Sequence, residues 1–539
     1  MPSWWAPLGV LVFFALPFVV RLIAGGAGVA RGWRSPIDLP VAGALCAVVA
    51  VATAWSAGAY LEGGPYTASD FAEYCEVVDA TLEGRAHASG QRSLVVAGLL
   101  APLVSALGVL DGFAVGAAAG VGVIAAGVYL WAHALAGRTA AVAGAVFVVA
   151  CAPLAVFART LTFYPAVVAA SALASGATAM ALRTRTTPWL ALAAAAAAAA
   201  PLFDVRNVLW TAACAPLVLL AALVPPLGAP FHRLRALARV ALVPLFLVTS
   251  WQIGSATLPA MAAGTLEEQT RAFTNDVRRL ATGAPPLPPC AGRGFKWGRF
   301  AVRELPVTVA CLSRMSAGIP PAAAREANGG GRWARAVGPW MPLLGVGALL
   351  AAAGMSRERA LRQLGVLVLL APAVPFVITA ATAWQDPNWR RIGAMFVPMP
   401  VLLGVAWAVV LEPERGSVLH RVLAPFQPAT AAARRYTALA AVGAVAVVLG
   451  LPYTALSPTA PARAPWPADT EWATFTNGTW RDHPRQALCA ARFEADARRG
   501  LPTLGRLGTL WWGAAPVRRE VFPDDGTGGA ALAPPLRAP

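Results

Sequence analysis

The chain has 539 residues, of which 58% are hydrophobic and only 13% are Asp, Glu, Lys or Arg. A soluble globular domain has roughly a quarter of its residues charged, so this composition excludes a disordered chain, a fibrous protein and an ordinary cytosolic enzyme. A polytopic membrane protein remains. The formal net charge is +17, from 43 basic and 26 acidic residues, and every basic residue except Lys296 is arginine. Where those arginines lie decides whether they indicate nucleic-acid binding or membrane topology.

Twelve apolar segments are long enough, or nearly so, to cross a bilayer as helices, which takes about 20 apolar residues. In chain order they are 4–23, 39–60, 114–135, 140–158, 166–182, 189–203, 208–227, 240–254, 337–354, 363–383, 392–411 and 437–456. Because 189–203 and 240–254 are short, we expect each to extend into flanking residues or to lie inside the bundle. The predicted fold is an all-α polytopic membrane protein with a bundle of about 12 transmembrane helices.

A further apolar stretch, Leu94–Leu110, is assigned from charge. If it does not cross, the loops on one side carry sixteen arginines and the short loops on the other side six. If it did cross, every later loop would change sides and this bias would reverse, against the positive-inside rule. We therefore predict a surface helix here, with both termini outside. Residues 1–456 form the transmembrane domain, with outer loops at 61–113 and 255–336, and 457–539 form an extracytoplasmic tail. The arginines then orient the bundle, and no nucleic-acid partner is expected.

The first outer loop crowds acidic residues around one apolar stripe. The stripe recurs at helical spacing and comprises Phe71, Cys75, Val78 and Leu82, while the acids on the other faces are Asp70, Glu73, Glu76, Asp79 and Glu83. This pattern predicts a short amphipathic helix that begins near Asp70 and ends near Gly84. Two interpretations stay open. Asp70 and Glu73 could form a capping box on a hydrated helix, or Asp70 could be a general base held at the membrane surface.

The spacing Asp70-x3-Tyr74, followed by Gly84 and placed directly after an early span, resembles the first outer loop of GT-C glycosyltransferases. These include the protein O-mannosyltransferases and the lipid A aminoarabinose transferases. Members are polytopic, use polyprenyl-phosphate-linked sugars as donors, and have a first-loop aspartate that is thought to be the catalytic base. The resemblance covers about residues 39–411. It also includes the turn at Gly137-Arg138, the arginine at Arg159 and the segment Trp389-Arg390-Arg391, and it implies a GT-C-like bundle.

The resemblance implies a set of site residues. The catalytic residues would be Asp70 and Glu73, and the substrate-binding residues would be Tyr74, Arg159, Tyr164, Arg206, Trp389, Arg390 and Arg391. For Arg206 the residues alone leave two interpretations, an interfacial ion pair with Asp204 or a phosphate contact, since a guanidinium can bind phosphate in a bidentate way. For Trp389, Arg390 and Arg391 the alternative to a substrate contact is an interfacial aromatic belt with snorkelling arginines.

The function this implies is transfer of a sugar from a polyprenyl-phosphate donor to a lipid, glycan or protein acceptor, on the extracytoplasmic face of a bacterial cell membrane and with inversion. The other partner is membrane lipid. The second outer loop lacks the acidic residue that several members place there, so no cofactor is certain and a divalent metal is not favoured. The alternatives are a transporter or flippase of a lipid-linked or amphipathic anion, and a structural subunit of an envelope complex.

Overall fold

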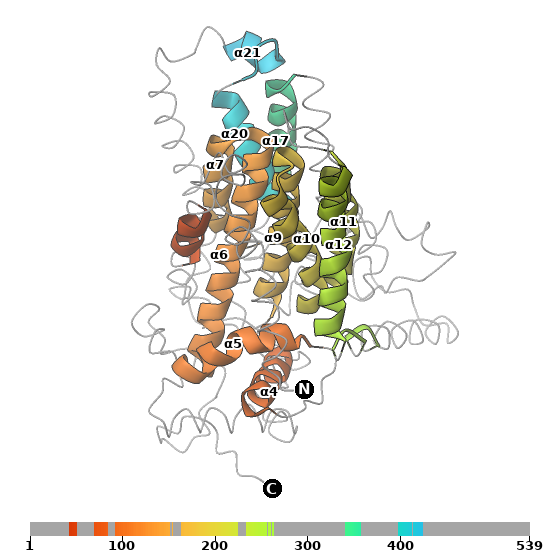
Figure 1. The fold of residues 1–539 in the computed structure, drawn as a ribbon. Coiled ribbons are helices and arrows are strands. Elements are labelled where there is room, and N and C mark those ends of the chain that lie inside the picture. The colour runs from red at the N-terminus through yellow and green to blue at the C-terminus, as the bar shows by residue number, and fades with distance from the viewer. Residues whose placement is uncertain are drawn as a thin grey trace, which may run out of the picture.

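A computed structural model of the protein describes residues 42–50, 69–84, 92–150, 154, 163–224, 233–255, 257–259, 261–263, 340–356, 397–411 and 413–423. Within these residues every regular element is helical (Figure 1). The helices with defined bounds are α4 (Ser69–Glu83), α5 (Leu94–Leu107), α6 (Val109–Ala136), α7 (Arg138–Ala150), α9 (Tyr164–Thr184), α10 (Thr187–Phe203), the 3-10 turn η3 (Val205–Asn207), α11 (Val208–Leu223), α12 (Arg233–Gly254), α17 (Trp340–Gly354), α20 (Pro398–Leu411) and α21 (Val418–Leu423).

Four of the described helices are long and apolar enough to cross a bilayer, and they confirm four of the predicted spans. They cover Gly112–Ala136, Tyr164–Thr184, Val205–Leu223 and Arg233–Gly254. The chain is thus an integral membrane protein. Four more predicted spans fall on α7, α10, α17 and α20. The segment 39–60 is described only as a helical stretch at 42–50. The predicted spans 4–23, 363–383 and 437–456 and the tail 457–539 lie outside the described residues.

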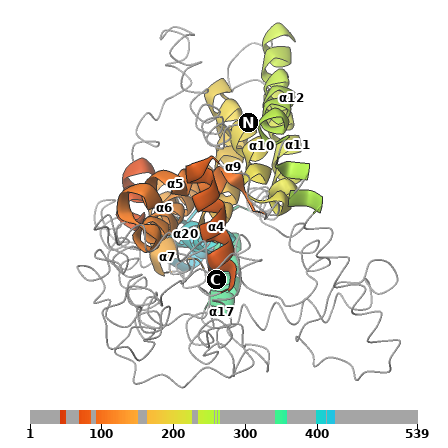
Figure 2. The ribbon, with the colours of Figure 1, turned by 90° about the horizontal axis from the view of Figure 1, so that it is seen from below.

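The two short predicted spans differ in how they are accommodated. The alanine-rich α10 is buried along nearly its whole length, so it lies inside the bundle. α12 instead extends its predicted span by about two turns, beginning at Arg233, and only 22% of its apolar window is buried. Seen from the α4 end, α12, α11 and α10 lie on one side of α9, while α7, α20 and α17 lie beyond α6 (Figure 2).

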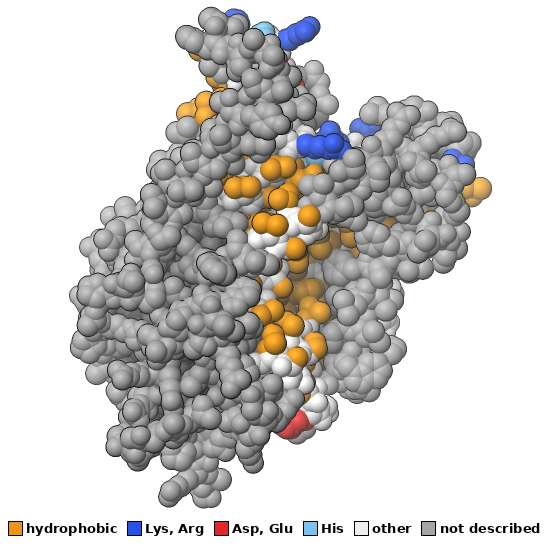
Figure 3. Space-filling model, turned by 90° about the vertical axis from the view of Figure 1, so that its left-hand side faces the viewer, with side chains coloured by type: hydrophobic (Ala, Val, Ile, Leu, Met, Phe, Trp, Pro, Cys, Tyr) orange, Lys and Arg blue, Asp and Glu red, His pale blue; other side chains and the backbone are white. Residues whose placement is uncertain are grey.

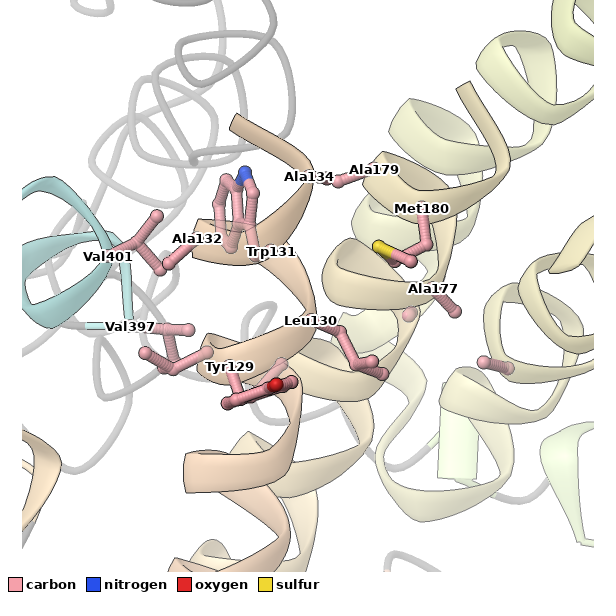
Figure 4. Packing of buried hydrophobic residues seen from close by; sticks show 14 of the residues in the cluster. Tyr129, Leu130, Trp131, Ala132, Ala134, Ala177, Ala179, Met180, Val397 and Val401 are labelled. Carbon is pink, nitrogen blue, oxygen red and sulfur yellow. The ribbon is translucent and has the colours of Figure 1, made fainter. Parts of the chain in front are cut away.

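The centre of the bundle is the α6–α9 pair, which packs closely because small residues face each other. A Cβ at Gly127 would lie 2.5 Å from the Ala172 carbonyl carbon, and one at Gly176 would collide with the Gly127 carbonyl oxygen. Without a strong hydrophobic force between helices in lipid, such close backbone approach supplies the packing energy. α6 also packs against Val397 and Val401 on its other side, so it is covered on two sides (Figure 4).

Helix α5 lies across the end of α6 rather than alongside the bundle helices (Figure 1). With 14 residues it is about 21 Å long, too short to cross a bilayer. The change of direction occurs at Gly108, whose φ of 84° favours glycine. The first turn of α6 then lies so close to α5 that a Cβ at Gly112 would be 2.7 Å from the Val104 Cα. This placement agrees with the surface helix that the arginine count predicts at Leu94–Leu110.

Helix α4 forms where the amphipathic pattern predicts it and ends at Gly84, whose φ is +66°. It begins at Ser69, so Asp70 lies in its first turn and not at the N-cap. One expectation was wrong: the acids do not all hydrate the helix, because Glu76 is 4% exposed and Asp79 is 7% exposed. The helix is buried around most of its circumference from Tyr74 to Thr81, which a single apolar stripe does not indicate.

The charged side chains separate to the two ends of the molecule. On the face shown in Figure 3, arginine side chains lie near one end, apolar side chains form a band below them, and an acidic side chain lies at the other end. Arg138, Arg183 and Arg185 mark the end opposite α4. The charge separation around an apolar band is what a membrane protein requires, since charges within the hydrocarbon core are costly.

Candidate functional site

The candidate site is built on the C-terminal end of α10, where a proline frees a backbone carbonyl. Pro201 has no N–H, so the Ala197 carbonyl four residues earlier loses its helical hydrogen bond. The Thr211 hydroxyl of α11 donates to that carbonyl at 2.5 Å. The Ser250 hydroxyl of α12 donates to the next carbonyl, that of Ala198. The end of α10 is therefore tied to two neighbouring helices by side-chain hydrogen bonds.

Two further side chains satisfy the last carbonyls of α10. The buried Asn207 amide donates from Nδ2 to the carbonyls of Ala200 and Val167, both at 3.2 Å, and its Oδ1 accepts from the Ser171 hydroxyl at 3.0 Å. The Ser93 hydroxyl, at the N-cap of α5, donates to the Leu202 carbonyl at 2.5 Å. Because buried polar groups that lack partners are costly, these contacts hold η3 and the start of α5 in fixed positions.

Directly after α10, Asp204 and Arg206 form a bidentate ion pair. Asp204 Oδ1 accepts from the Arg206 backbone N–H and from Nε, both at 2.8 Å, and Oδ2 accepts from Nη2 at 2.5 Å. Burial alone would raise the pKa of Asp204, but the Arg206 charge and hydrogen bonds, with a contribution from Arg92, hold it below its ordinary value. The Arg206 side chain stays 37% exposed, so a ligand can reach it.

Aromatic rings lie beside both arginines. The Arg206 guanidinium carbon lies 5.9 Å from the centroid of Tyr164, the first residue of α9. The Arg92 guanidinium carbon lies 4.7 Å from the centroid of Tyr74 on α4, within the range of a cation–π contact. Tyr74, only 1% exposed, also packs on Phe163 with a centroid distance of 4.4 Å. We call Tyr74, Arg92, Phe163, Tyr164, Asp204 and Arg206 the arginine–aromatic cluster.

The structure brings together three of the residues that the sequence assigns to the site: Tyr74, Tyr164 and Arg206. Asp70 and Glu73 lie in the first turns of α4, the helix that Tyr74 joins to the cluster, but their side chains are outside the described residues. Arg159, Trp389, Arg390 and Arg391 are also outside the described residues. Their assignment stays a prediction.

Sequence reasoning missed Arg92 as a member of the site. It precedes the N-cap serine of the surface helix, and its charge acts on Asp204. The signal available in the sequence was a cation next to Ser93, the residue that begins α5. Taken by themselves, Arg92, Arg206 and Asp204 carry one net positive charge. Among the described residues, no three His, Cys, Asp or Glu side chains are grouped to hold a metal ion.

The described residues thus define a class: an all-helical integral membrane protein whose acid-bearing helix α4 packs on an arginine–aromatic cluster at one end of the bundle. No protein-family model and no curated protein matches the sequence. Among solved structures, the Archaeoglobus fulgidus oligosaccharyltransferase, tethered to an acceptor peptide, is similar with a TM-score of 0.46 and 12% identity over 86% of this chain. The matched part spans only 59% of that protein's length.

ArnT from Cupriavidus metallidurans is also similar. The form bound to undecaprenyl phosphate has a TM-score of 0.42 and 15% identity, covering 89% of this chain and 77% of ArnT. The similarity is therefore to GT-C glycosyltransferases, the class that the first-loop pattern resembles. Because each TM-score is below 0.5, these similarities assign no residue and no substrate to this chain.

Proposed function

We propose that the protein is an integral membrane glycosyltransferase of the GT-C type, which transfers a sugar from a polyprenyl-phosphate donor to an acceptor on the extracytoplasmic face. The observation that carries the proposal is the packing of α4 on the arginine–aromatic cluster through Tyr74. That contact holds the helix that bears Asp70 at the same bundle end as Arg92 and Arg206, so a candidate base and candidate phosphate ligands belong to one assembly.

The proposed reaction is a single inverting displacement. The Asp70 carboxylate accepts the proton of the acceptor hydroxyl as its oxygen attacks the anomeric carbon. The bond from that carbon to the phosphate oxygen breaks, and polyprenyl phosphate leaves with the bonding electron pair. A general base of this kind contributes typically 10²–10⁴-fold to the rate. Glu73 would orient or support Asp70.

The arginines would stabilise the charge that develops on the departing phosphate. Asp204 engages Nε and Nη2 of Arg206 and Tyr164 also hydrogen-bonds this side chain, so the phosphate would approach the part of Arg206 that stays exposed. Arg92 supplies a second positive charge, and Arg159 and Arg390 are further candidates from the sequence. Because Asp204 neutralises one of the arginines, two or more cations are needed for a net positive site. Tyr164 lies under Arg206 and keeps its plane oriented.

The test is Asp70→Asn in membranes supplied with a labelled polyprenyl-phosphate sugar and extracted acceptor. We expect transfer to fall at least 100-fold, with membrane insertion and thermal stability unchanged. The matched control is Glu83→Gln, which removes an exposed acid from the far end of the same helix and should keep transfer near the wild-type rate. Wild-type transfer by a properly inserted Asp70→Asn protein would overturn the assignment of the base.

A further inference from the structure

At the end of the bundle opposite α4, the buried Arg239 of α12 binds the free carbonyls of two helix ends. Residue 225 is proline, so the Ala221 carbonyl at the end of α11 lacks its helical donor. Arg239 Nη2 donates to the carbonyls of Ala221 at 3.1 Å and of Arg185 at 2.6 Å, and both terminal nitrogens donate to that of Val224 at 3.3 Å. These contacts account for Nη1 and Nη2, but not for the rest of the guanidinium.

The remaining donor and the charge of Arg239 point to an anion. Arg239 is only 8% exposed, and its buried Nε has no hydrogen-bond partner in the described structure. The one side-chain charge recorded as acting on it within the described residues is that of Arg185, which is of the same sign. The described residues of α9, α11 and α12 contain no carboxylate that could compensate. A buried cation beside a like charge is unfavourable unless an anion joins it.

The surroundings of this pair fit an anion that carries acyl chains. Arg235 precedes Arg239 by one helical turn and so lies on the same side of α12. The N-terminal turns of this 22-residue helix add a positive partial charge. From here α12 exposes a long apolar surface, in which the largest exposed side chains are Leu234, Leu237, Leu245, Val248 and Trp251. A headgroup held at the exposed Arg235 would therefore have apolar surface for its chains on the outer face of the same helix.

We propose that Arg185, Arg235 and Arg239 bind the phosphate of an anionic phospholipid, whose acyl chains lie along the exposed apolar surface of α12. Guanidinium groups bind phosphate in a bidentate, charge-assisted way. Basic pockets between membrane helices favour anionic headgroups over zwitterionic ones. This lipid site lies at the opposite end of the bundle from the arginine–aromatic cluster, and it does not depend on the proposed sugar transfer.

The test uses the full-length protein in a neutral maltoside detergent, titrated with phosphatidylglycerol and with phosphatidylcholine of the same chains. Binding is followed by native mass spectrometry and by the shift of the thermal transition. The Arg185→Gln/Arg235→Gln variant leaves the structural contacts of the Arg239 side chain in place. The matched control, Arg138→Gln/Arg421→Gln, removes the same charge from two exposed arginines outside the site.

We expect phosphatidylglycerol to bind the wild type more tightly than phosphatidylcholine does. The first variant should weaken phosphatidylglycerol binding about 25-fold, or fivefold for each arginine, since a basic residue near an anionic lipid surface is worth about 1 kcal/mol. The control should bind within twofold of the wild type. Equal loss in both variants, no loss in either, or full competition by millimolar inorganic phosphate would each overturn the proposal. If the double variant does not fold, Arg235→Gln alone gives the same comparison, because Arg235 is exposed.

Discussion

The two ends of the bundle both gather arginines around helix termini, yet they treat the charge differently. At the α4 end, Arg206 is paired with Asp204, and both Arg206 and Arg92 lie beside aromatic rings. At the opposite end, Arg239 meets backbone carbonyls and a second arginine. One end therefore holds fixed, oriented guanidinium groups with part of their charge neutralised, and the other holds positive charge that, within the described residues, meets only backbone carbonyl dipoles.

This difference separates two uses of arginine in a membrane protein. An oriented arginine with a carboxylate partner can present a donor edge to a substrate without rearranging. An arginine bound to carbonyls keeps its full charge and so stays able to attract an anion. Arg206 and Arg239 cannot be told apart in the sequence. Their hydrogen-bond partners in the structure distinguish the two uses.

The largest loss of stability is expected at the α4 end, from Asn207→Leu. The change removes three hydrogen bonds and leaves the Ala200 carbonyl at the end of α10 without its side-chain donor. We expect the free energy of unfolding in detergent to fall by about 3 kcal/mol. Thr249→Val is the control, because its exposed hydroxyl bonds only within α12. Equal thermal transitions for the two variants would show that the anchoring of η3 contributes nothing to stability.

A smaller loss is expected at the opposite end, from Arg239→Leu. The apolar side chain removes the donors to the carbonyls of Arg185, Ala221 and Val224 but also removes a buried like charge from Arg185. These effects oppose each other, so we expect a net loss of about 2 kcal/mol, measured by thermal unfolding. Arg239→Lys keeps the charge and fewer donors, and should be intermediate. A leucine variant as stable as the wild type would mean that the carbonyl contacts are not needed.

The smallest effect, and the one that best separates the ends, is that of pH on Asp204. Since its pKa is lowered in the folded protein, the ion pair stabilises the fold above the ordinary pKa of about 4 and loses that effect as pH falls through the lowered value. Asp204→Asn should cost about 1 kcal/mol near pH 7, because Arg206 is partly exposed to solvent. The cost should shrink between pH 5 and pH 3. A constant difference in melting temperature over this range would contradict the ion-pair account.

Charge and hydropathy were enough to predict most of the helices that the structure describes. The arginine count placed Leu94–Leu110 across the bundle end, and the structure has α5 there. Periodicity predicted α4 and its end at Gly84. These succeed because crossing a bilayer and keeping charges out of it are constraints on each segment by itself, independent of which neighbour it meets.

The details of the site depend on neighbours, and the sequence could not supply them. The burial of Glu76 and Asp79 reflects what covers α4, which no local pattern encodes. Thr211 meets the carbonyl that Pro201 frees because α11 folds back along α10. Arg92 joins the cluster through its contact with Tyr74 of α4, and no sequence pattern indicates that contact. Of the residues predicted for the site, the structure brings Tyr74, Tyr164 and Arg206 together, and Arg92 lies with them although the sequence did not indicate it.

The single residue Gly108 has a consequence for how the protein is made. Leu94 to Ala136 is one nearly unbroken apolar run, longer than a bilayer is thick. The bend at Gly108 divides that run into α5, too short to cross a bilayer, and α6, long enough to do so. If the run were inserted as two spans instead, every later loop would lie on the opposite side of the membrane.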